Sequence, residues 1–367
     1  GKTAMIRRKG ILAVVLLIIL IIVLRSSTSS AQATSKSGHA QQDQDQNENS
    51  AHRIPPQGRA LGSKHQVTMD DLSDKPLRDR LRYQFPYDLE GKFPAYIWQT
   101  WKVTPASGDF SEELRPYEAS WTELHPGFVH EVVTDSAAEN LIRYLYGAIP
   151  EVIEAYQAMP LPILKADFFR YLILLARGGI YTDIDTLALK SATEWLPDSM
   201  DRLSVGLIVG IEADVISEGR PDWYEWYSRP IQLCQWTIQA KPGHPVLRDV
   251  VANITEEALR MKRKGILTES RMDKTIVEFT GPAVWTDAIF RYLNDPQYFN
   301  FSDKDHPNVT YNDLAGLKEQ KKIGDVAILP ITSFSPGVGQ MGAEDAEHPL
   351  AFVLHSFGGK PRSLLLL

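Results

Sequence analysis

The sequence is organised around one stretch near its middle, Arg177-Gly178-Gly179-Ile180-Tyr181-Thr182-Asp183-Ile184-Asp185-Thr186. An apolar helical pattern over residues 164–176 precedes it, and the glycine pair ends that helix. We expect a short extended segment after the glycines, and side chains two apart on a strand share a face. Asp183 and Asp185 would then point the same way, and two like charges that close repel unless a cation or a proton lies between them. The stretch therefore predicts a divalent metal site or acid/base chemistry.

Strands and helices alternate on both sides of this stretch. Helices are expected over residues 111–124, 136–146, 150–158, 246–264 and 283–293. Strands are expected over residues 93–101, 129–133, 205–211, 326–329 and 352–354. This alternation predicts an α/β domain with a largely parallel sheet. No internal linker interrupts residues 91–367, so we predict that they form one domain.

The carboxylate pair lies where a strand of an α/β domain is expected to end, which is where ligands usually bind. Hard oxygen ligands suit Mn²⁺ or Mg²⁺. His355, beside two glycines at the end of the last expected strand, is a candidate third metal ligand. The alternative is an exposed acidic turn without a ligand, because a D-x-D sequence alone also arises by chance.

Other candidate residues each have a structural alternative. Asp167 and Arg170 are three apart on the preceding helix, which by spacing alone indicates a surface ion pair. Trp98 and Trp101 lie on or just after the first strand, where a ring either packs in the core or stacks on a nucleobase or sugar. The aromatic run over residues 223–227 either packs against the sheet or forms a platform for a sugar acceptor.

Composition excludes some classes of protein. The 367 residues carry a formal net charge of −7, which argues against a nucleic-acid partner. The chain contains one cysteine, Cys234, so it cannot form an intramolecular disulfide, and we predict that this side chain is a small buried hydrophobe.

The N-terminal region predicts a route into the secretory pathway. Residues 11–24 are an apolar run behind a basic flank, which favours a signal-anchor with residues 1–10 in the cytosol. A cleaved signal peptide is the alternative, with residues 31–33 as its cleavage site. Residues 25–90 are predicted to be a flexible stem, because most of them are polar, and a helix within about residues 70–90 would lead into the folded part. Asn253, Asn300 and Asn308 lie in sequons and are candidate N-glycosylation sites.

Three ordered segments carry a resemblance to a known family. They are Tyr-Ile-Trp-Gln-Thr-Trp-Lys at 96–102, Ala-Asp-Phe-Phe-Arg-Tyr at 166–171 with Gly-Gly-Ile-Tyr-Thr-Asp-Ile-Asp at 178–185, and Thr-Gly-Pro-Ala-Val-Trp-Thr-Asp at 280–287. Together they resemble the fungal initiation-specific α-1,6-mannosyltransferases, which belong to the glycosyltransferase family with a D-x-D sugar-binding region (family 32). The resemblance extends over about residues 93–359.

The resemblance implies a GT-A fold, a Rossmann-like nucleotide-sugar domain. It implies GDP-mannose as the donor, an N-linked high-mannose glycoprotein as the acceptor, an α-1,6 linkage formed with retention, and Mn²⁺ or Mg²⁺ as cofactor. It also implies a single-pass type II protein of the Golgi membrane with a lumenal catalytic domain, and membership of a mannosyltransferase complex is possible.

Residue roles follow from the same resemblance. Asp185 would bind the metal, Asp183 would contact the ribose or the water shell of the metal, and His355 would lie near the metal and the diphosphate. Asp167 and Arg170 would reach the donor sugar.

The resemblance also implies roles for Trp98 and Asp287, and the sequence differs from the family pattern at one place. Trp98 would lie beside the guanine, and Asp287 is a candidate contact for the acceptor or the sugar. The family leads us to expect a Ser-Trp pair soon after the C-terminal His and glycine, but the sequence there reads Gly359-Lys360-Pro361-Arg362.

The mechanism expected is metal-assisted glycosyl transfer, with Arg170 and Lys360 adding positive charge near the leaving diphosphate. No residue is a convincing nucleophile, so front-face attack and a covalent intermediate both stay open. Three rival functions also stay open: a D-x-D-x-T phosphatase of the haloacid-dehalogenase type, a non-catalytic carbohydrate-binding subunit, and a sibling mannosyltransferase acting on a glycolipid or on cell-wall mannan.

Overall fold

The computed structural model describes residues 72–219, 221–272, 275–299, 308–337 and 341–356. The predicted cytosolic tail, the signal-anchor and most of the predicted stem lie outside these residues. Lys360 and the divergent C-terminal end also lie outside them. No helix within the described ranges combines the length and apolar character that crossing a bilayer requires.

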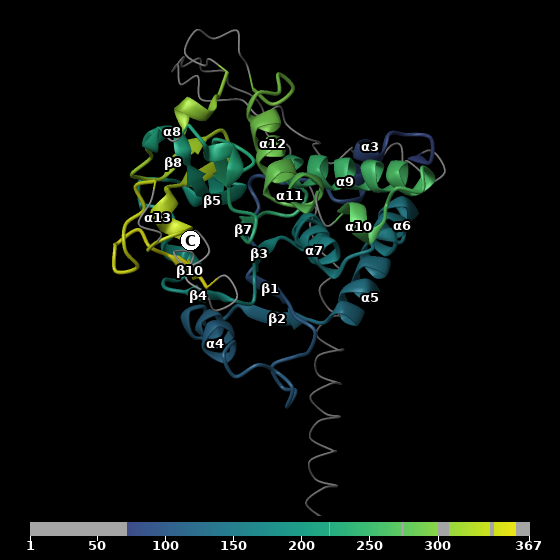
Figure 1. Ribbon diagram of the computed structural model, residues 1–367, viewed down its shortest axis with the longest axis horizontal. Helices are drawn as coiled ribbons and strands as arrows, with labels where there is room; N and C mark the ends of the chain where they lie inside the picture. Colours follow the sequence, from purple (N-terminus) through teal and green to yellow (C-terminus); the bar gives the residue numbers. More distant parts are fainter. Residues whose placement is uncertain (1–71, 220, 273–274, 300–307, 338–340, 357–367) are drawn as a thin grey trace, which may run out of the picture. The chain divides into compact units, whose positions relative to one another are not determined.

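The described residues build a mixed β-sheet with helices packed around it (Figure 1). Its strands, in spatial order, are β2 (Val129–Val133), β1 (Tyr96–Thr100), β3 (Gly179–Thr182), β7 (Thr237–Ala240), β5 (Leu207–Asp214), β9 (Val326–Leu329) and β8 (Lys321–Ile323), with β6 (Ile231–Leu233) paired to β5. A separate antiparallel ladder joins β4 (Thr186–Ala188) to β10 (Val353–His355). The strands predicted over residues 129–133 and 326–329 are confirmed.

The sheet is mixed rather than largely parallel. β1 pairs in parallel with β2 and β3, and β5 pairs in parallel with β9. β7 is antiparallel to both β3 and β5, and β6 and β8 are also antiparallel to their neighbours. Because β7 reverses direction between them, β3 and β5 run the same way. The carboxyl ends of β1, β3, β5 and β9 therefore lie at one edge of the sheet.

Helices flank this sheet, and most of their predicted bounds are accurate to within two residues. The longer helices are α4 (Arg115–Leu124), α5 (Asp135–Leu145), α6 (Pro150–Ala158), α7 (Pro162–Arg177), α9 (Pro245–Arg263) and α12 (Pro282–Leu293). The short ones are α3 (Leu77–Gln84), α8 (Val215–Glu218), α10 (Glu269–Met272), α11 (Ile276–Phe279) and α13 (Ile331–Phe334). α4 starts later than predicted because Pro116 occupies its first turn, where a missing N–H costs nothing.

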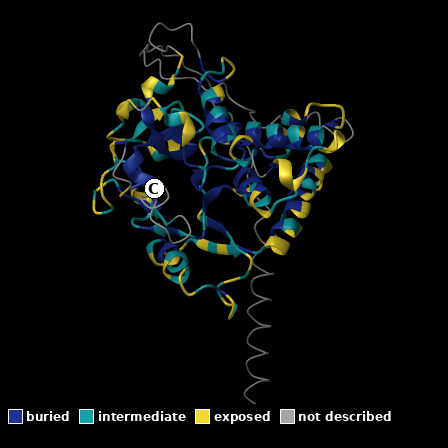
Figure 2. Ribbon diagram, in the orientation of Figure 1, coloured by how far each residue is buried: buried dark blue, intermediate teal, exposed yellow. Residues whose placement is uncertain are grey.

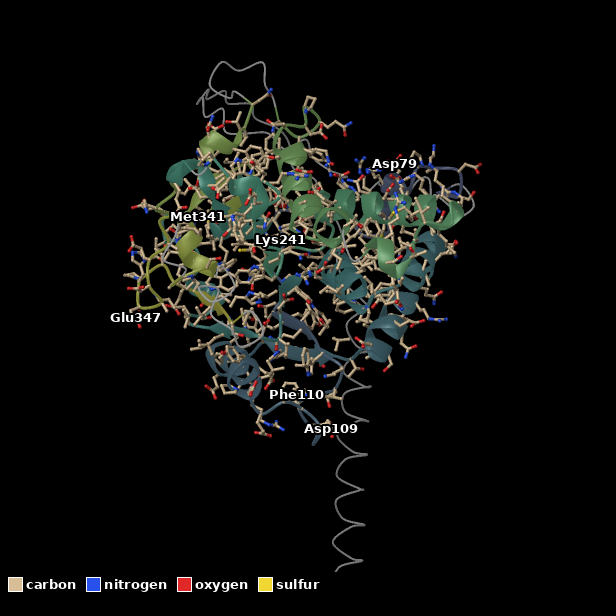
Figure 3. The ribbon with its side chains drawn as sticks, viewed as in Figure 1. Asp79, Asp109, Phe110, Lys241, Met341 and Glu347 are labelled. Atoms are coloured by element: carbon tan, nitrogen blue, oxygen red, sulfur yellow. The ribbon has the colours of Figure 1, made fainter. Side chains whose placement is uncertain are left out.

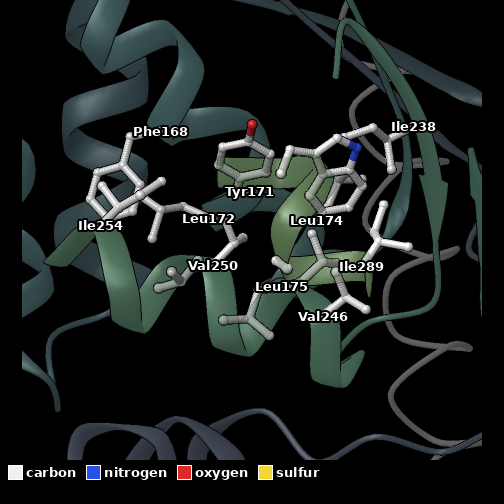
Figure 4. Packing of buried hydrophobic residues seen from close by; sticks show 14 of the residues in the cluster. Phe168, Tyr171, Leu172, Leu174, Leu175, Ile238, Val246, Val250, Ile254 and Ile289 are labelled. Carbon is white, nitrogen blue, oxygen red and sulfur yellow. The ribbon is translucent and has the colours of Figure 1, made fainter. Parts of the chain in front are cut away.

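The core is centred on α7, which is apolar on most of its surface, as expected of a helix buried within a domain. Leu172 and Leu175 pack against Val246 and Val250 of α9, and Ile238 of β7 lies close by (Figure 4). Strands β3, β5, β6, β7 and β9 and this helix form the buried interior, whereas β2 and β8 are partly exposed, and many exposed residues lie on the outer faces of the surrounding helices (Figure 2).

The glycine pair lets α7 pass into β3 without an intervening loop. Gly178 has φ 64°, and a Cβ there would lie 2.8 Å from the carbonyl oxygen of Ala240. Gly179 has φ 96°, and a Cβ there would lie 2.6 Å from the carbonyl oxygen of Tyr96. Both positions need a left-handed backbone and a close approach to another strand, which glycine alone allows at low cost.

Part of the predicted stem belongs to the folded domain. The predicted helix near residues 70–90 is α3, and its Leu81 is fully buried. Arg78 of α3 forms an ion pair with Asp249 of α9 at 3.0 Å. Lys241, labelled within the domain in Figure 3, donates a hydrogen bond to the carbonyl of Leu89 at 2.6 Å. The folded part therefore starts before Leu77 and not at residue 91.

Asp325 is fully buried beside β9 and contacts side chains from three other segments of the chain. Its replacement should therefore destabilise the domain. Its carboxylate accepts hydrogen bonds from the hydroxyls of Tyr87 and Tyr292, the latter at 2.8 Å, and lies 3.2 Å from Nε2 of His244. Removing one partner of a buried charged network costs about 3–5 kcal/mol. We expect Asp325→Asn to lower the free energy of unfolding by about that amount at pH 7, measured by urea denaturation. Asp345→Asn, the same change at an exposed position, should stay within about 0.5 kcal/mol of the parent.

The effect should depend on pH. Burial by itself would raise the pKa of Asp325, but His244 and the two tyrosine hydroxyls lower it below its ordinary value of 3.8. A carboxyl whose pKa is lower in the folded state adds stability that is present above the unfolded pKa and is lost as the pH falls through the folded pKa. The stability difference between parent and Asp325→Asn should therefore shrink below about pH 4. A difference that stays constant down to pH 2 would contradict this account.

Candidate active site

The D-x-D carboxylates lie on a turn, so the prediction that they share one face of a strand is wrong. β3 ends at Thr182 and β4 begins at Thr186. The hydroxyls of these two threonines are 2.7 Å apart, and the amide of Thr186 donates to the carbonyl of Asp183 at 3.2 Å. The side chain of Gln99, on β1, donates to the same carbonyl at 3.1 Å. These bonds fix the backbone that presents Asp183 and Asp185.

His355 completes a cluster of three possible metal ligands. The pairing of β10 with β4 places His355 opposite Thr186. Its Nε2 lies 3.1 Å from Oδ1 of Asp185, and its ring stacks on Trp236 with centroids 4.6 Å apart. One donor atom each from Asp183, Asp185 and His355 can be chosen so that all three lie within 4.8 Å of one another. The structure thus brings His355, predicted as a third metal ligand, beside the D-x-D pair.

Arg170 connects this cluster to α7. Its guanidinium is 3% exposed, and Nη2 lies 2.8 Å from Oδ1 of Asp167 and 3.3 Å from Oδ1 of Asp183. Nη1 donates to the carbonyl of Gln235 at 2.9 Å, and the guanidinium lies over the ring of Tyr181. The buried Nε has no hydrogen-bond partner among the described residues. Asp167 and Arg170 are therefore a buried pair facing the D-x-D turn and not a surface ion pair.

Gln235 was not predicted, yet it supports this pair from a neighbouring segment. Its side-chain amide donates to Asp167 at 3.2 Å, and its side-chain carbonyl accepts from the hydroxyl of Tyr171 at 2.8 Å. Thr280 donates to the other carboxylate oxygen of Asp167 at 3.0 Å. Thr280 lies in one of the segments that carry the family resemblance, but Gln235 belongs to no motif, so no sequence pattern indicated it.

Negative charge exceeds positive charge at this site. Asp167 and Asp183 both pair with one guanidinium, that of Arg170, and Asp185 lies next to Asp183 in the cluster of possible metal ligands. Burial raises the pKa of Asp167 to about 6, although Arg170 opposes the shift, and burial likewise raises the pKa of Asp183. Burial alone would lower the pKa of Arg170, but the nearby carboxylates raise it, so the guanidinium stays charged. The remaining negative charge on the turn favours a cation.

Trp98 occupies the core and not an open base-stacking position. It is 8% exposed, its ring stacks on Tyr96, and its indole N–H donates to the carbonyl of Gly178 at 2.9 Å. The core-packing alternative therefore describes Trp98. Trp101, just past the end of β1, is partly exposed. Its buried indole nitrogen has no partner within the described ranges.

Asp287 lies in a second polar cluster on α12. Both of its carboxylate oxygens accept from Arg229, at 2.8 and 2.7 Å. The same guanidinium donates to Glu278 at 3.2 and 3.1 Å. No hydrogen bond or ion pair in the described part of the chain joins Asp287 directly to the D-x-D cluster.

The remaining sequence predictions have mixed outcomes. Cys234 is buried, as predicted. Asn308 is exposed, whereas Asn253 lies within α9, is partly buried, and contacts Arg78 and Asp249 through its side-chain amide. Asn300 lies outside the described residues.

Comparison with known proteins agrees with this site. Residues 111–201, which include the D-x-D turn and α7, match the model of the glycosyltransferase sugar-binding region containing the DXD motif. The initiation-specific alpha-1,6-mannosyltransferase of Candida albicans is 46% identical over 297 residues, which cover 78% of this chain and 76% of that protein. The Schizosaccharomyces pombe protein of the same name is 43% identical over 284 residues, which cover 77% of this chain and 66% of that protein.

A solved structure, the PaToxG glycosyltransferase, aligns over 59% of this chain and 76% of its own with 14% identity and a TM-score of 0.37, which is too low to establish a shared fold. The sequence matches and the site together define a glycosyltransferase with a D-x-D sugar-binding region. The chain belongs to the family of the initiation-specific α-1,6-mannosyltransferases.

Proposed function

We propose that this chain is a metal-dependent, retaining α-1,6-mannosyltransferase that transfers mannose from GDP-mannose to an N-linked high-mannose glycoprotein. One observation carries the proposal: the D-x-D turn, His355 and the buried Asp167–Arg170 pair meet at the carboxyl edge of the sheet. A GT-A arrangement is part of the proposal, because nucleotide sugars would bind at this edge of a Rossmann-like sheet.

The residues of the turn fit Mn²⁺ or Mg²⁺. Asp185 and His355 would hold the ion, since a carboxylate oxygen and an imidazole nitrogen are donors that Mn²⁺ accepts and the turn carries excess negative charge. The carboxylate of Asp183 already pairs with Arg170 and accepts a hydrogen bond from the hydroxyl of Tyr181. These contacts favour a role for Asp183 in positioning the site over direct ligation of the metal. When bound, the cation would neutralise charge on the leaving diphosphate.

Arg170 would orient the donor. Its unpartnered Nε is a buried donor, and an unpaired buried polar group is costly, so a hydroxyl or phosphate oxygen of the donor is a favourable partner for it. Asp167 and Gln235 hold the guanidinium in place. Such preorganised contacts would stabilise the negative charge that develops on the diphosphate as the bond between the sugar and the phosphate breaks.

The aromatic run supplies a surface for the acceptor. The run follows β5, whose carboxyl end lies at the same edge as the D-x-D turn. Tyr224 is 68% exposed and Trp226 is 46% exposed, whereas Tyr227 is buried in the core. Arg229 then fixes the end of this loop to Asp287. Exposed rings backed by a polar cluster suit the mixed faces of a mannose chain.

Trp226→Ala should weaken acceptor binding. We expect the KM for the glycan acceptor to rise about tenfold, because a ring covered by a sugar contributes roughly 1.5 kcal/mol, while the KM for GDP-mannose stays unchanged. Initial-rate kinetics with varied acceptor measure this. Tyr144→Ala removes an exposed ring from α5 and serves as the control. An unchanged acceptor KM in Trp226→Ala would remove the platform from the proposal.

The cellular setting is also part of the proposal. Arg7, Arg8 and Lys9 before the apolar run at residues 11–24 favour a type II orientation in the Golgi membrane, with the catalytic domain in the lumen. The exposed Asn308 sequon is compatible with a lumenal domain.

The test of the proposed function is transfer to a high-mannose glycan from a panel of nucleotide sugars in the presence of Mn²⁺. We expect GDP-mannose to be used, and linkage analysis of the product to give an α-1,6-mannose. Transfer from a different nucleotide sugar, or an acceptor restricted to glycolipid or mannan, would overturn the proposal. Phosphate release without a sugar nucleotide would support the phosphatase alternative instead.

A further inference from the structure

A pocket of about 280 Å³ lies beside the carboxyl end of β1. Residues of α5, of the end of α6 and of the first turns of α7 line it. The lining residues include Thr100, Asp135, Glu139, Leu161, Lys165 and Phe169. The pocket contains no residue of the D-x-D turn, so it is distinct from the metal cluster.

Hydrogen bonds connect this pocket to the D-x-D turn. The hydroxyl of Thr100, on the pocket wall, lies 3.2 Å from the hydroxyl of Tyr181, which donates to Asp183 at 3.1 Å. Ala166 also lines the pocket, and the next residue of α7 is Asp167. A molecule that fills the pocket and extends past Thr100 would therefore reach the carboxylates of the turn.

The pocket walls combine apolar surface with three charged side chains. The partly exposed Leu161 offers apolar surface for a flat ring, whereas Phe169, which also borders the pocket, is fully buried. Asp135 and Glu139 are four residues apart on α5 and so lie on one face of that helix. Glu139 already accepts from Arg143 at 2.8 Å and from Gln157 at 3.1 Å.

Asp135 differs from Glu139, because its carboxylate makes no hydrogen bond or ion pair to any other described residue. Lys165, the third charged group, places its ammonium 5.7 Å from the centre of the Tyr156 ring. The pocket therefore offers one ammonium donor and one exposed carboxylate that has no hydrogen-bond or ion-pair partner among the described residues.

We propose that this pocket binds the guanine base of the nucleotide donor, with the Asp135 carboxylate accepting from N1–H and the N2 amine and the Lys165 ammonium donating to O6. Guanine presents two adjacent N–H donors beside a carbonyl, which match a carboxylate and an ammonium that line the same pocket. Adenine presents an unprotonated N1 to the carboxylate, and uracil presents a single N–H between two carbonyls. The pocket thus selects the base, a role that Trp98 cannot fill from the core. This inference rests on the proposed function, whose donor it specifies.

Equilibrium binding of nucleoside diphosphates to the full-length chain with Mn²⁺ tests the assignment. Isothermal titration calorimetry compares GDP, IDP, ADP and UDP, and IDP differs from GDP only in lacking the N2 amine. The parent should bind GDP more tightly than the other three. Asp135→Asn should lower GDP affinity about 10- to 100-fold, the usual loss when a bidentate base contact is broken, and should bring GDP and IDP close to equal affinity.

Two variants make the result specific. Glu131→Gln removes the same charge from an exposed position on β2 that does not line the pocket, and it should leave every affinity unchanged. Lys165→Met should weaken GDP and IDP by similar factors, because both carry O6, and should leave ADP unchanged. The ratio of GDP to IDP affinity is insensitive to partial unfolding, because unfolding lowers both affinities equally.

The outcomes separate this inference from the proposed function. If the parent prefers GDP but Asp135→Asn keeps the parental ratio of GDP to IDP affinity, the guanine assignment is wrong and the donor proposal stands. If the parent prefers UDP or ADP to GDP, the proposed donor fails and the guanine assignment fails with it.

Discussion

Asp185→Ala is expected to lower mannose transfer by about 100-fold or more in the presence of Mn²⁺. Lewis-acid stabilisation of a leaving group is worth several kcal/mol, and each 1.4 kcal/mol or so is a factor of ten in rate. Asp185 contacts His355, and the two residues hold the ion in our proposal. Initial rates with GDP-mannose and a high-mannose glycan measure the loss, and chelation of the metal should reduce the parent to a similar rate.

The control for this prediction is Asp198→Ala, which makes the same change at an exposed position outside the site. It should transfer mannose at the parental rate. Circular dichroism and the midpoint of thermal unfolding establish that both variants are folded. A folded Asp185→Ala protein that transfers mannose at a near-parental rate would show that the D-x-D turn is not the metal site.

Arg170→Met is expected to abolish transfer and to destabilise the domain. The substitution leaves the buried carboxylate of Asp167 and the partly buried carboxylate of Asp183 without their shared cation, and breaking a buried ion pair costs about 3–5 kcal/mol. Urea denaturation should show a loss of that size. Transfer should fall even under conditions in which the variant is folded, because the Nε donor is lost with the guanidinium.

A double variant separates the two effects. Asp167→Asn in the Arg170→Met background neutralises one of the two carboxylates that have lost their cation, so part of the lost stability should return. Transfer should not return, because no donor replaces Nε. Recovery of both stability and transfer would mean that Arg170 acts only as a structural cation.

Much of the framework was predictable from the sequence. The apolar periodicity that ends at Gly178 predicted α7, and its bounds agree with the structure to within two residues. The D-x-D stretch and its family resemblance indicated a sugar-nucleotide site, and the family is confirmed. The direction of the sheet was not predictable in the same way, because β7 is only four residues long and nothing in so short a segment indicates that it runs antiparallel.

The sequence by itself determined α7, the glycine pair and the two carboxylates, because helical period, left-handed glycines and charge spacing are local properties. Only the tertiary structure decided that Asp183 and Asp185 lie on a turn, that His355 reaches Asp185 across 170 residues, and that Gln235 supports a buried Arg170. These contacts depend on strand pairing and on exclusion of water, which bring together residues that no local pattern links. The same reason places Trp98 in the core and leaves the carboxylate of Asp135 in the pocket beside β1.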